Sequence, residues 1–212
     1  MSEVEADHSA IDWRELVAVI LLSVTTVLTA WSGFQATKWA GVMAISFNQA
    51  SATKIEATRQ EGAADRKQAI QVSLYAQWVQ ARASQDQALM DYLSVRFPEP
   101  LKTAFAAWVA TNPDTNPQAP SSPFVMPEYS LPELAAADAA DQRAEDQVAA
   151  ALEANQRGDN YTLLTVAFAS VLFFAAMSGK MRSRGRQLIL LDSALALFAT
   201  GALLLLIFPK RF

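Results

Sequence analysis

Few residues in this chain could take part in chemistry. The sequence contains no cysteine and a single histidine, His8, which we expect to be solvent-exposed near the N-terminus. The lack of cysteine excludes disulfides, zinc–thiolate sites and thiol nucleophiles, and one histidine leaves most acid–base and metal chemistry without its usual groups. No phosphate-binding loop, dinucleotide fingerprint or triad pattern occurs in the sequence. We therefore expect a protein that is not an enzyme, with no catalytic residue, no metal site and no cofactor.

Acidic residues offer two candidates for ion binding. Acidic and glutamine side chains are frequent from Asp138 to Gln147, but this run lacks the ligand spacing and the glycine of a calcium loop, so it indicates a solvated helix face. Asp192 lies a few residues inside an apolar stretch, where ionisable residues are candidates for function. Because it is near the end of that stretch, we favour a structural ion pair with Lys180 or Arg182 over a role in an ion pathway.

Three apolar stretches must position these residues: Leu16–Phe34, Tyr161–Ser178 and Leu188–Phe208. Each is long enough, or nearly so, to cross about 30 Å of hydrocarbon as an α-helix. A cleaved signal peptide is the competing interpretation of the first stretch, but the residues before it are acidic rather than basic. The predicted fold class is an all-α membrane protein, with an extramembrane helical hairpin at 36–159 and transmembrane helices at 16–35, 160–178 and 188–208.

Basic residues near the membrane predict the orientation. The loop at 179–187 carries four of them: Lys180, Arg182, Arg184 and Arg186. Because short basic loops remain cytoplasmic, we expect a bacterial inner-membrane protein with its N-terminal tail (1–15) inside and its C-terminal tail (209–212) outside. Two observations argue the other way: the N-terminal tail offers only Arg14, and the C-terminal tail carries Lys210 and Arg211. The net charge of −4 disfavours a nucleic-acid partner, which leaves the lipid bilayer as the expected surroundings.

The segment from 36 to 97 has helical periodicity. Apolar residues recur at three-, four- or eight-residue spacing and predict one buried stripe: Ile70, Leu74, Trp78, Ala81, Leu89, Leu93 and Phe97. We expect one long helix that continues from the first span. A bend is predicted near Gly62, because glycine costs about 1 kcal/mol in a helix interior.

Eight of the nine prolines fall in the segment 98–132. This composition predicts a mobile connector with a short helix at 101–111, and a recognition loop is the functional alternative. Ser130 and Glu133 then have the spacing of a capping box, which would start a helix that lies antiparallel to the one at 36–61. A break at 158–160 would separate this helix from the second span, and without it one helix would enter the membrane directly.

Small residues recur every four positions along the first span: Thr25, Thr29, Gly33, Thr37 and Gly41. A second row contains Ser32, Ala36, Ala40 and Ala44. Such rows let helix backbones approach closely in lipid. The row could pack against the other spans of the same chain or against a second copy, and the sequence leaves both open.

Part of the sequence is similar to a set of uncharacterised bacterial multi-span integral membrane proteins. The similarity rests on Thr29–Trp39 and on Lys54, Glu56 and the Ala57-Thr58-Arg59 that follow, and it covers about the first third of the chain. It implies a bacterial membrane protein of this layout. Those proteins have no assigned activity that could be carried over.

These observations favour a structural or interaction protein whose hairpin binds another envelope protein or a second copy of itself. An oligomeric pore or ion-conducting assembly is the alternative, in which hydroxyls of the first span would line a polar path: Ser23, Thr25, Thr26, Thr29 and Ser32. Interhelical hydrogen bonding is the other role of such hydroxyls. A sensor is disfavoured, because the predicted cytoplasmic segments leave no room for an output domain.

Overall fold

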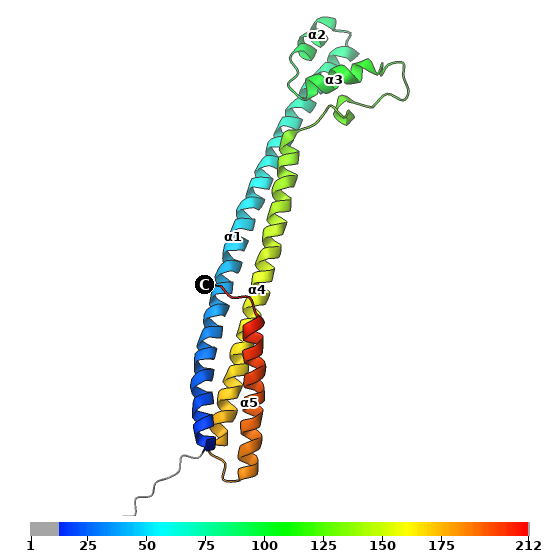
Figure 1. Ribbon diagram of the computed structural model, residues 1–212. Coiled ribbons are helices and arrows are strands. Elements are labelled where there is room, and N and C mark those ends of the chain that lie inside the picture. Colours follow the sequence, from blue (N-terminus) through cyan, green and yellow to red (C-terminus); the bar gives the residue numbers. More distant parts are fainter. Residues whose placement is uncertain (1–12, 212) are drawn as a thin grey trace, which may run out of the picture. The chain divides into compact units, whose positions relative to one another are not determined.

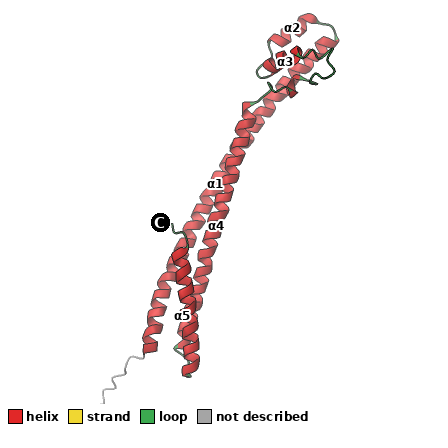
Figure 2. Cartoon of the chain, turned by 45° about the vertical axis from the view of Figure 1, so that its right-hand side comes forward, coloured by secondary structure: helices red, strands yellow, loops and turns green. Residues whose placement is uncertain are grey.

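The computed structural model describes residues 13–211, except for the side chain of Arg14. His8 and most of the N-terminal tail therefore lie outside the described residues. Within them the structure is all-helical and has no strand. Five α-helices and a short 3-10 helix, η1, follow one another (Figure 1): α1 (Trp13–Ala83), α2 (Gln87–Val95), α3 (Leu101–Ala110), η1 (Pro123–Val125), α4 (Pro132–Ser178) and α5 (Arg184–Ile207). Figure 2 shows the loops that join them.

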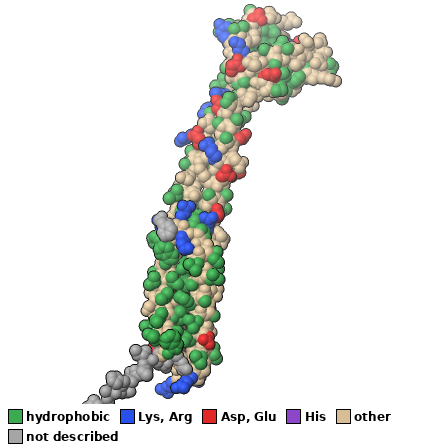
Figure 3. All heavy atoms as spheres, in the orientation of Figure 1, with side chains coloured by type: hydrophobic (Ala, Val, Ile, Leu, Met, Phe, Trp, Pro, Cys, Tyr) green, Lys and Arg blue, Asp and Glu red, His purple; other side chains and the backbone are tan. Residues whose placement is uncertain are grey.

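Three of these helices, α1, α4 and α5, contain windows long and apolar enough to cross a membrane. The predicted all-α fold with three spans is therefore confirmed. Large apolar side chains in these windows are exposed rather than packed, such as Val27 (67%), Leu163 (67%) and Leu206 (74%). Figure 3 shows hydrophobic side chains over this part of the surface. Contiguous apolar surface of this kind is costly in water and is the surface that lipid chains cover.

The helices belong to two compact units. Among the described residues, the first unit comprises 13–48 and 147–211 and the second comprises 49–146, so α1 and α4 contribute to both. In the first unit α1, α4 and α5 form a three-helix bundle with two apolar clusters. One cluster contains Trp39, Ala154, Tyr161, Leu164, Phe168 and Leu205, and the other contains Leu21, Val171, Ala175, Leu191 and Ala194.

Gly201 brings α5 close to α4 in the first unit. A Cβ atom at this position would lie 2.9 Å from Cε1 of Phe168, whose side chain is fully buried. Gly158 faces α1 less tightly, since a Cβ there would lie 3.6 Å from the carbonyl oxygen of Ala36. The packing therefore requires a glycine at position 201 but not at position 158.

In the second unit α1 and α4 lie antiparallel, as predicted. Their facing sides bury alanines with coiled-coil spacing: Ala50, Ala57 and Ala64 in α1, and Ala137, Ala140 and Ala144 in α4. Two ion pairs join the helices, Lys54 with Asp141 (2.9 Å) and Lys67 with Glu133. Lys67 follows Lys54 in α1, whereas its partner Glu133 precedes Asp141 in α4. The two pairs are therefore consistent only with antiparallel helices in this register.

Two predicted helix limits need correction, and the alternative left open at 158–160 is decided. α1 continues through Gly62 and ends at Ala83, where the backbone turns through Gln85 with φ of 59°. No break occurs at 158–160, because α4 is continuous from Pro132 to Ser178. The basic loop is shorter than the predicted 179–187, since α5 begins at Arg184.

Two side-chain predictions for this region also need correction. Ile70 (60%) and Leu89 (41%) are exposed, and Gln71 occupies the buried position instead. The seven-residue spacing of the helix pair selects 64, 71 and 78 for the buried side, which excludes position 70. The capping box does not form as predicted, because α4 begins at Pro132 and Glu133 pairs with Lys67 across the helix pair.

Candidate functional site

The proline-rich segment 98–132 folds onto α1 within the second unit. Composition predicted a connector that builds no core, with a short helix at 101–111; the helix is present as α3, but the segment does contribute to a core. A buried core joins it to α1 and α2: Trp78, Leu93, Phe97, Leu101, Phe105 and Trp108. Phe124, Met126 and Tyr129 pack against that core from the segment around η1. The composition argument failed because these large apolar side chains, interleaved with the prolines, supply enough surface to bury.

Ring contacts and one hydrogen bond fix this head region, defined as residues 71–131. Trp78 and Phe105 meet edge to face with ring centroids 4.9 Å apart, and Phe97 meets Phe105 at 5.0 Å. Nε1 of Trp108 donates to the carbonyl oxygen of Pro120 at 2.7 Å. That bond ties the irregular loop to α3, so the loop has a defined position on the aromatic core.

Buried polar groups complete the head region. Nε2 of Gln71 donates to the carbonyl oxygen of Glu99 at 3.0 Å, which explains why an amide occupies a core position in α1. Burial raises the pKa of the Tyr75 and Tyr129 hydroxyls, so both phenols are neutral at physiological pH. The head therefore has a neutral, largely aromatic interior.

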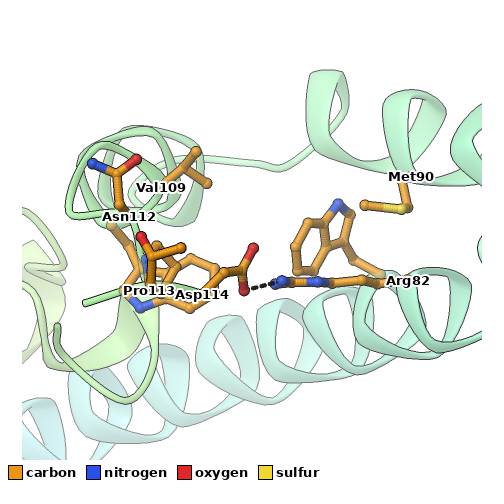
Figure 4. Close-up of a pocket in the computed structure, with 9 residues that line it drawn as sticks. Arg82, Met90, Val109, Asn112, Pro113 and Asp114 are labelled. Carbon is orange, nitrogen blue, oxygen red and sulfur yellow. Dashed lines mark hydrogen bonds and ion pairs between the residues drawn. The ribbon is translucent and has the colours of Figure 1, made fainter. Parts of the chain in front are cut away.

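A pocket of about 340 Å³ opens between α1, α2, α3 and the loop after α3. Its lining contains two indoles, one thioether and two charged groups: Trp78, Arg82, Met90, Trp108, Val109, Asn112, Pro113, Asp114 and Thr115. Figure 4 shows Arg82 reaching toward Asp114, with which it forms an ion pair. The Arg82 guanidinium also lies over the Trp78 ring, with Cζ 5.5 Å from the ring centroid. Asn112 adopts φ of 55°, which turns the chain so that Asp114 faces Arg82.

The pocket lining and the acidic run in α4 differ in the groups that they offer. The lining combines apolar and aromatic side chains with the polar side chains of Asn112 and Thr115, and its two charged groups pair with each other. Among residues 13–211 no group of three His, Cys, Asp or Glu side chains could hold a metal ion. The acidic run in α4 follows the predicted solvated face, with Asp138, Glu145 and Asp146 exposed and Asp141 paired with Lys54.

The small-residue row in the first span is divided between two environments. Thr25 is fully buried and Thr29 partly buried within the chain's own bundle, whereas Thr37 and Gly41 are exposed. Gly33 and Gly41 have no atom within 4 Å of an added Cβ. Each step of four residues turns about 40° further around an α-helix, so a row of five cannot stay on one face. Only the part of the row around Thr25 and Thr29 therefore packs within the chain's own bundle.

The predicted ionisable residues lie at one end of the bundle. Asp192 is exposed and forms no ion pair with Lys180 or Arg182, so the predicted pairing is not seen. The four basic residues are exposed as well: Lys180, Arg182, Arg184 and Arg186. Arg184 and Arg186 belong to the first turn of α5 rather than to the loop.

Hydroxyls of the first span mostly bond within their own helix. Ser23 donates to the carbonyl oxygen of Val19 at 2.9 Å, Thr26 to that of Leu22 at 2.8 Å, and Thr29 to that of Thr25 at 2.8 Å. These bonds satisfy the donors without a partner helix. Ser32 and Thr25 face the interior of the bundle, where both are fully buried.

One cluster at the other end of the bundle escaped the sequence analysis. Nε1 of Trp39 donates to the carbonyl oxygen of Pro209 at 3.2 Å, and the Tyr161 hydroxyl donates to the same oxygen at 3.1 Å. Gln35 bonds Arg211 twice: its Nε2 donates to the Arg211 carbonyl and its Oε1 accepts from the Arg211 backbone N–H, both at 2.9 Å. We call this group the C-terminal clasp. The only feature of the sequence that could have indicated the clasp is the four-residue spacing of Gln35 and Trp39 in α1.

The guanidinium groups of Arg157 and Arg211 lie over the ring of Trp39 in the clasp, and Lys38 and Lys210 each precede a clasp residue in the sequence. We call these four basic residues the basic collar. They come from α1, α4 and the segment after α5, which the clasp holds together. Figure 3 shows Lys and Arg side chains at both ends of the apolar surface.

Comparisons with protein-family models, with curated proteins and with solved structures give no match to this chain. The resemblance stated for residues 29–39 and 54–59 therefore stays an expectation. The interpretation of function rests on the geometry described above.

Proposed function

We propose that this protein is a membrane-anchored interaction protein whose head region binds another envelope protein. The observation that carries the proposal is the Trp78–Arg82–Trp108 pocket. Tryptophan and arginine are the residue types that dominate binding energy at protein interfaces, especially around a pocket. Exposed apolar side chains surround it or lie in the adjacent α2, including Val109 (45%), Tyr92 (55%) and Val95 (68%). A binding role uses all of these features.

Photocrosslinking in the native membrane tests this proposal. A benzoylphenylalanine probe at Val109 should give a specific adduct, and the same probe at Ile55, which is 55% exposed on α1 of the same unit, should not. Arg82→Gln removes the guanidinium charge at the pocket and should weaken the adduct. Equal crosslinking at both positions, or an adduct indifferent to Arg82→Gln, would contradict a pocket-centred interface.

We further propose the inner membrane as its location, with the N-terminus inside and the head outside. The short basic turn between α4 and α5 supports this orientation. The basic collar places four cations at the opposite end, so the charge count alone does not separate the two ends. Because the chain lacks cysteine, single cysteines at Ser183 and Thr115 can be probed with an impermeant maleimide in intact cells. Labelling of Thr115→Cys alone supports the orientation, and labelling of Ser183→Cys alone reverses it.

A second proposal is self-association through the exposed part of the small-residue row. It is supported by the open space around Gly33 and Gly41. Thr37→Cys should form a disulfide-linked dimer, while Lys38→Cys, equally exposed but about 100° away around the helix, should not. Equal linkage at both positions would indicate random collision. The pore alternative gains less support, since Ser23, Thr26 and Thr29 already donate to their own helix.

A further inference from the structure

The basic collar carries more positive charge than the protein neutralises. Arg157 forms an ion pair with Glu153. Within residues 13–211, Lys38, Lys210 and Arg211 have no carboxylate at ion-pair distance. Nζ of Lys210 donates to the carbonyl oxygen of Leu206 at 3.1 Å, and Nζ of Lys38 lies 5.9 Å from the Phe34 ring centroid, so neither contact neutralises the charge.

The guanidinium groups of the collar are held in place. Cζ of Arg157 lies 4.7 Å and Cζ of Arg211 lies 5.0 Å from the ring centroid of Trp39, whose indole is 2% exposed. A guanidinium that stacks on an aromatic face keeps its N–H donors at the edge, where they can form paired bonds to a phosphate. The backbone of Arg211 is fixed separately by Gln35.

The collar lies where lipid headgroups are expected. It follows the apolar windows of α1 and α5 and precedes that of α4, and it surrounds a tryptophan and a tyrosine, Trp39 and Tyr161. Such aromatic residues mark the membrane–water interface, and basic groups between membrane helices bind anionic headgroups. We propose that the basic collar binds the phosphate group of an anionic phospholipid.

Thermal unfolding of the full-length protein in a non-ionic detergent tests this site. Phosphatidylglycerol should raise the unfolding midpoint more than phosphatidylcholine with the same acyl chains. The double variant Lys210→Gln and Arg211→Gln should weaken the apparent phosphatidylglycerol affinity roughly 30-fold, from the loss of two basic residues near the headgroup. The clasp should survive, because Arg211 engages Gln35 through its backbone alone.

Two control variants test whether the effect belongs to this site and to its charge. Arg184→Gln with Arg186→Gln removes the same charge at the other end of the bundle and should keep the headgroup-specific shift. Lys210→Arg with Arg211→Lys keeps the charge and should also retain it. The proposal is overturned if Lys210→Gln with Arg211→Gln keeps the rise in unfolding midpoint caused by phosphatidylglycerol, or if Arg184→Gln with Arg186→Gln loses that rise equally. It is also overturned if soluble glycerol phosphate, which has no acyl chains, produces the same rise.

Discussion

Gly201→Ala tests the packing of the membrane bundle most directly. The substitution adds one methyl group at the point where α5 approaches α4. The new Cβ would lie 2.9 Å from Cε1 and 3.2 Å from Cζ of Phe168, distances that require one of the groups to move. Phe168 has no exposed surface and lies within the Trp39–Leu205 cluster, so its ring has no open space to enter. We expect the helices to separate slightly and the bundle to lose stability.

The size of the loss follows from two opposing effects. Overpacking a close-packed core costs about 1–3 kcal/mol. Replacing glycine by alanine in a helix interior returns up to about 1 kcal/mol. The expected net change in the free energy of unfolding is therefore a loss of roughly 0–2 kcal/mol. Gly158→Ala is the matched control, because its Cβ would meet Ala36 and Trp39 at 3.6 Å, an ordinary contact, and only the helical gain remains.

The difference between the two variants is the quantity to measure. Reversible unfolding in mixed micelles, followed by circular dichroism, should find Gly201→Ala about 1–3 kcal/mol less stable than Gly158→Ala. Phe168→Leu in the Gly201→Ala background should recover part of the loss, which a double-mutant cycle would report as coupling. Equal stability of the two alanine variants, or strict additivity with Phe168→Leu, would refute the inferred contact between α4 and α5.

Three further predictions concern other contacts. Gln35→Ala removes both bonds to the backbone of Arg211 and should cost about 1–3 kcal/mol, with faster proteolysis of the C-terminal segment as the readout. Ala64→Leu, at a position 1% exposed in the alanine-lined helix pair, should lower stability by about 1–3 kcal/mol in thermal unfolding. The hydrogen bond from Lys67, followed by that from its own backbone N–H, lowers the pKa of Glu133 below 4.5. The ion pair between Lys67 and Glu133 should therefore stabilise the folded state above pH 4.5, and this contribution should disappear as the pH falls through the lowered pKa of Glu133. The free energy of unfolding measured as a function of pH should show this loss in the natural protein, and the loss should be absent in Glu133→Gln.

The three apolar helices and the short helix α3 could be predicted from the sequence. Hydrophobic length and helical periodicity are local properties, and a run such as Leu188–Phe208 has few alternatives to a membrane helix. The antiparallel course of α1 and α4 was also predictable, since two spans joined by an outer segment must return to the same membrane. The continuity of α1 through Gly62 and of α4 through Gly158 was not predictable from the sequence. A glycine weakens a helix by only about 1 kcal/mol, and tertiary packing outweighs that cost.

Tertiary structure alone decided which side chains meet. Phe105 and Phe124 form one aromatic core with Trp78 because the proline-rich segment folds back over α1. A contact between residues so far apart in the sequence cannot be predicted from a local pattern. The same holds for the C-terminal clasp, where Gln35 and Arg211 are joined across 176 positions of sequence. Local propensity is set by neighbours along the chain. The pocket, the close approach at Gly201 and the basic collar arise from long-range packing, in which small gains from many distant contacts act together.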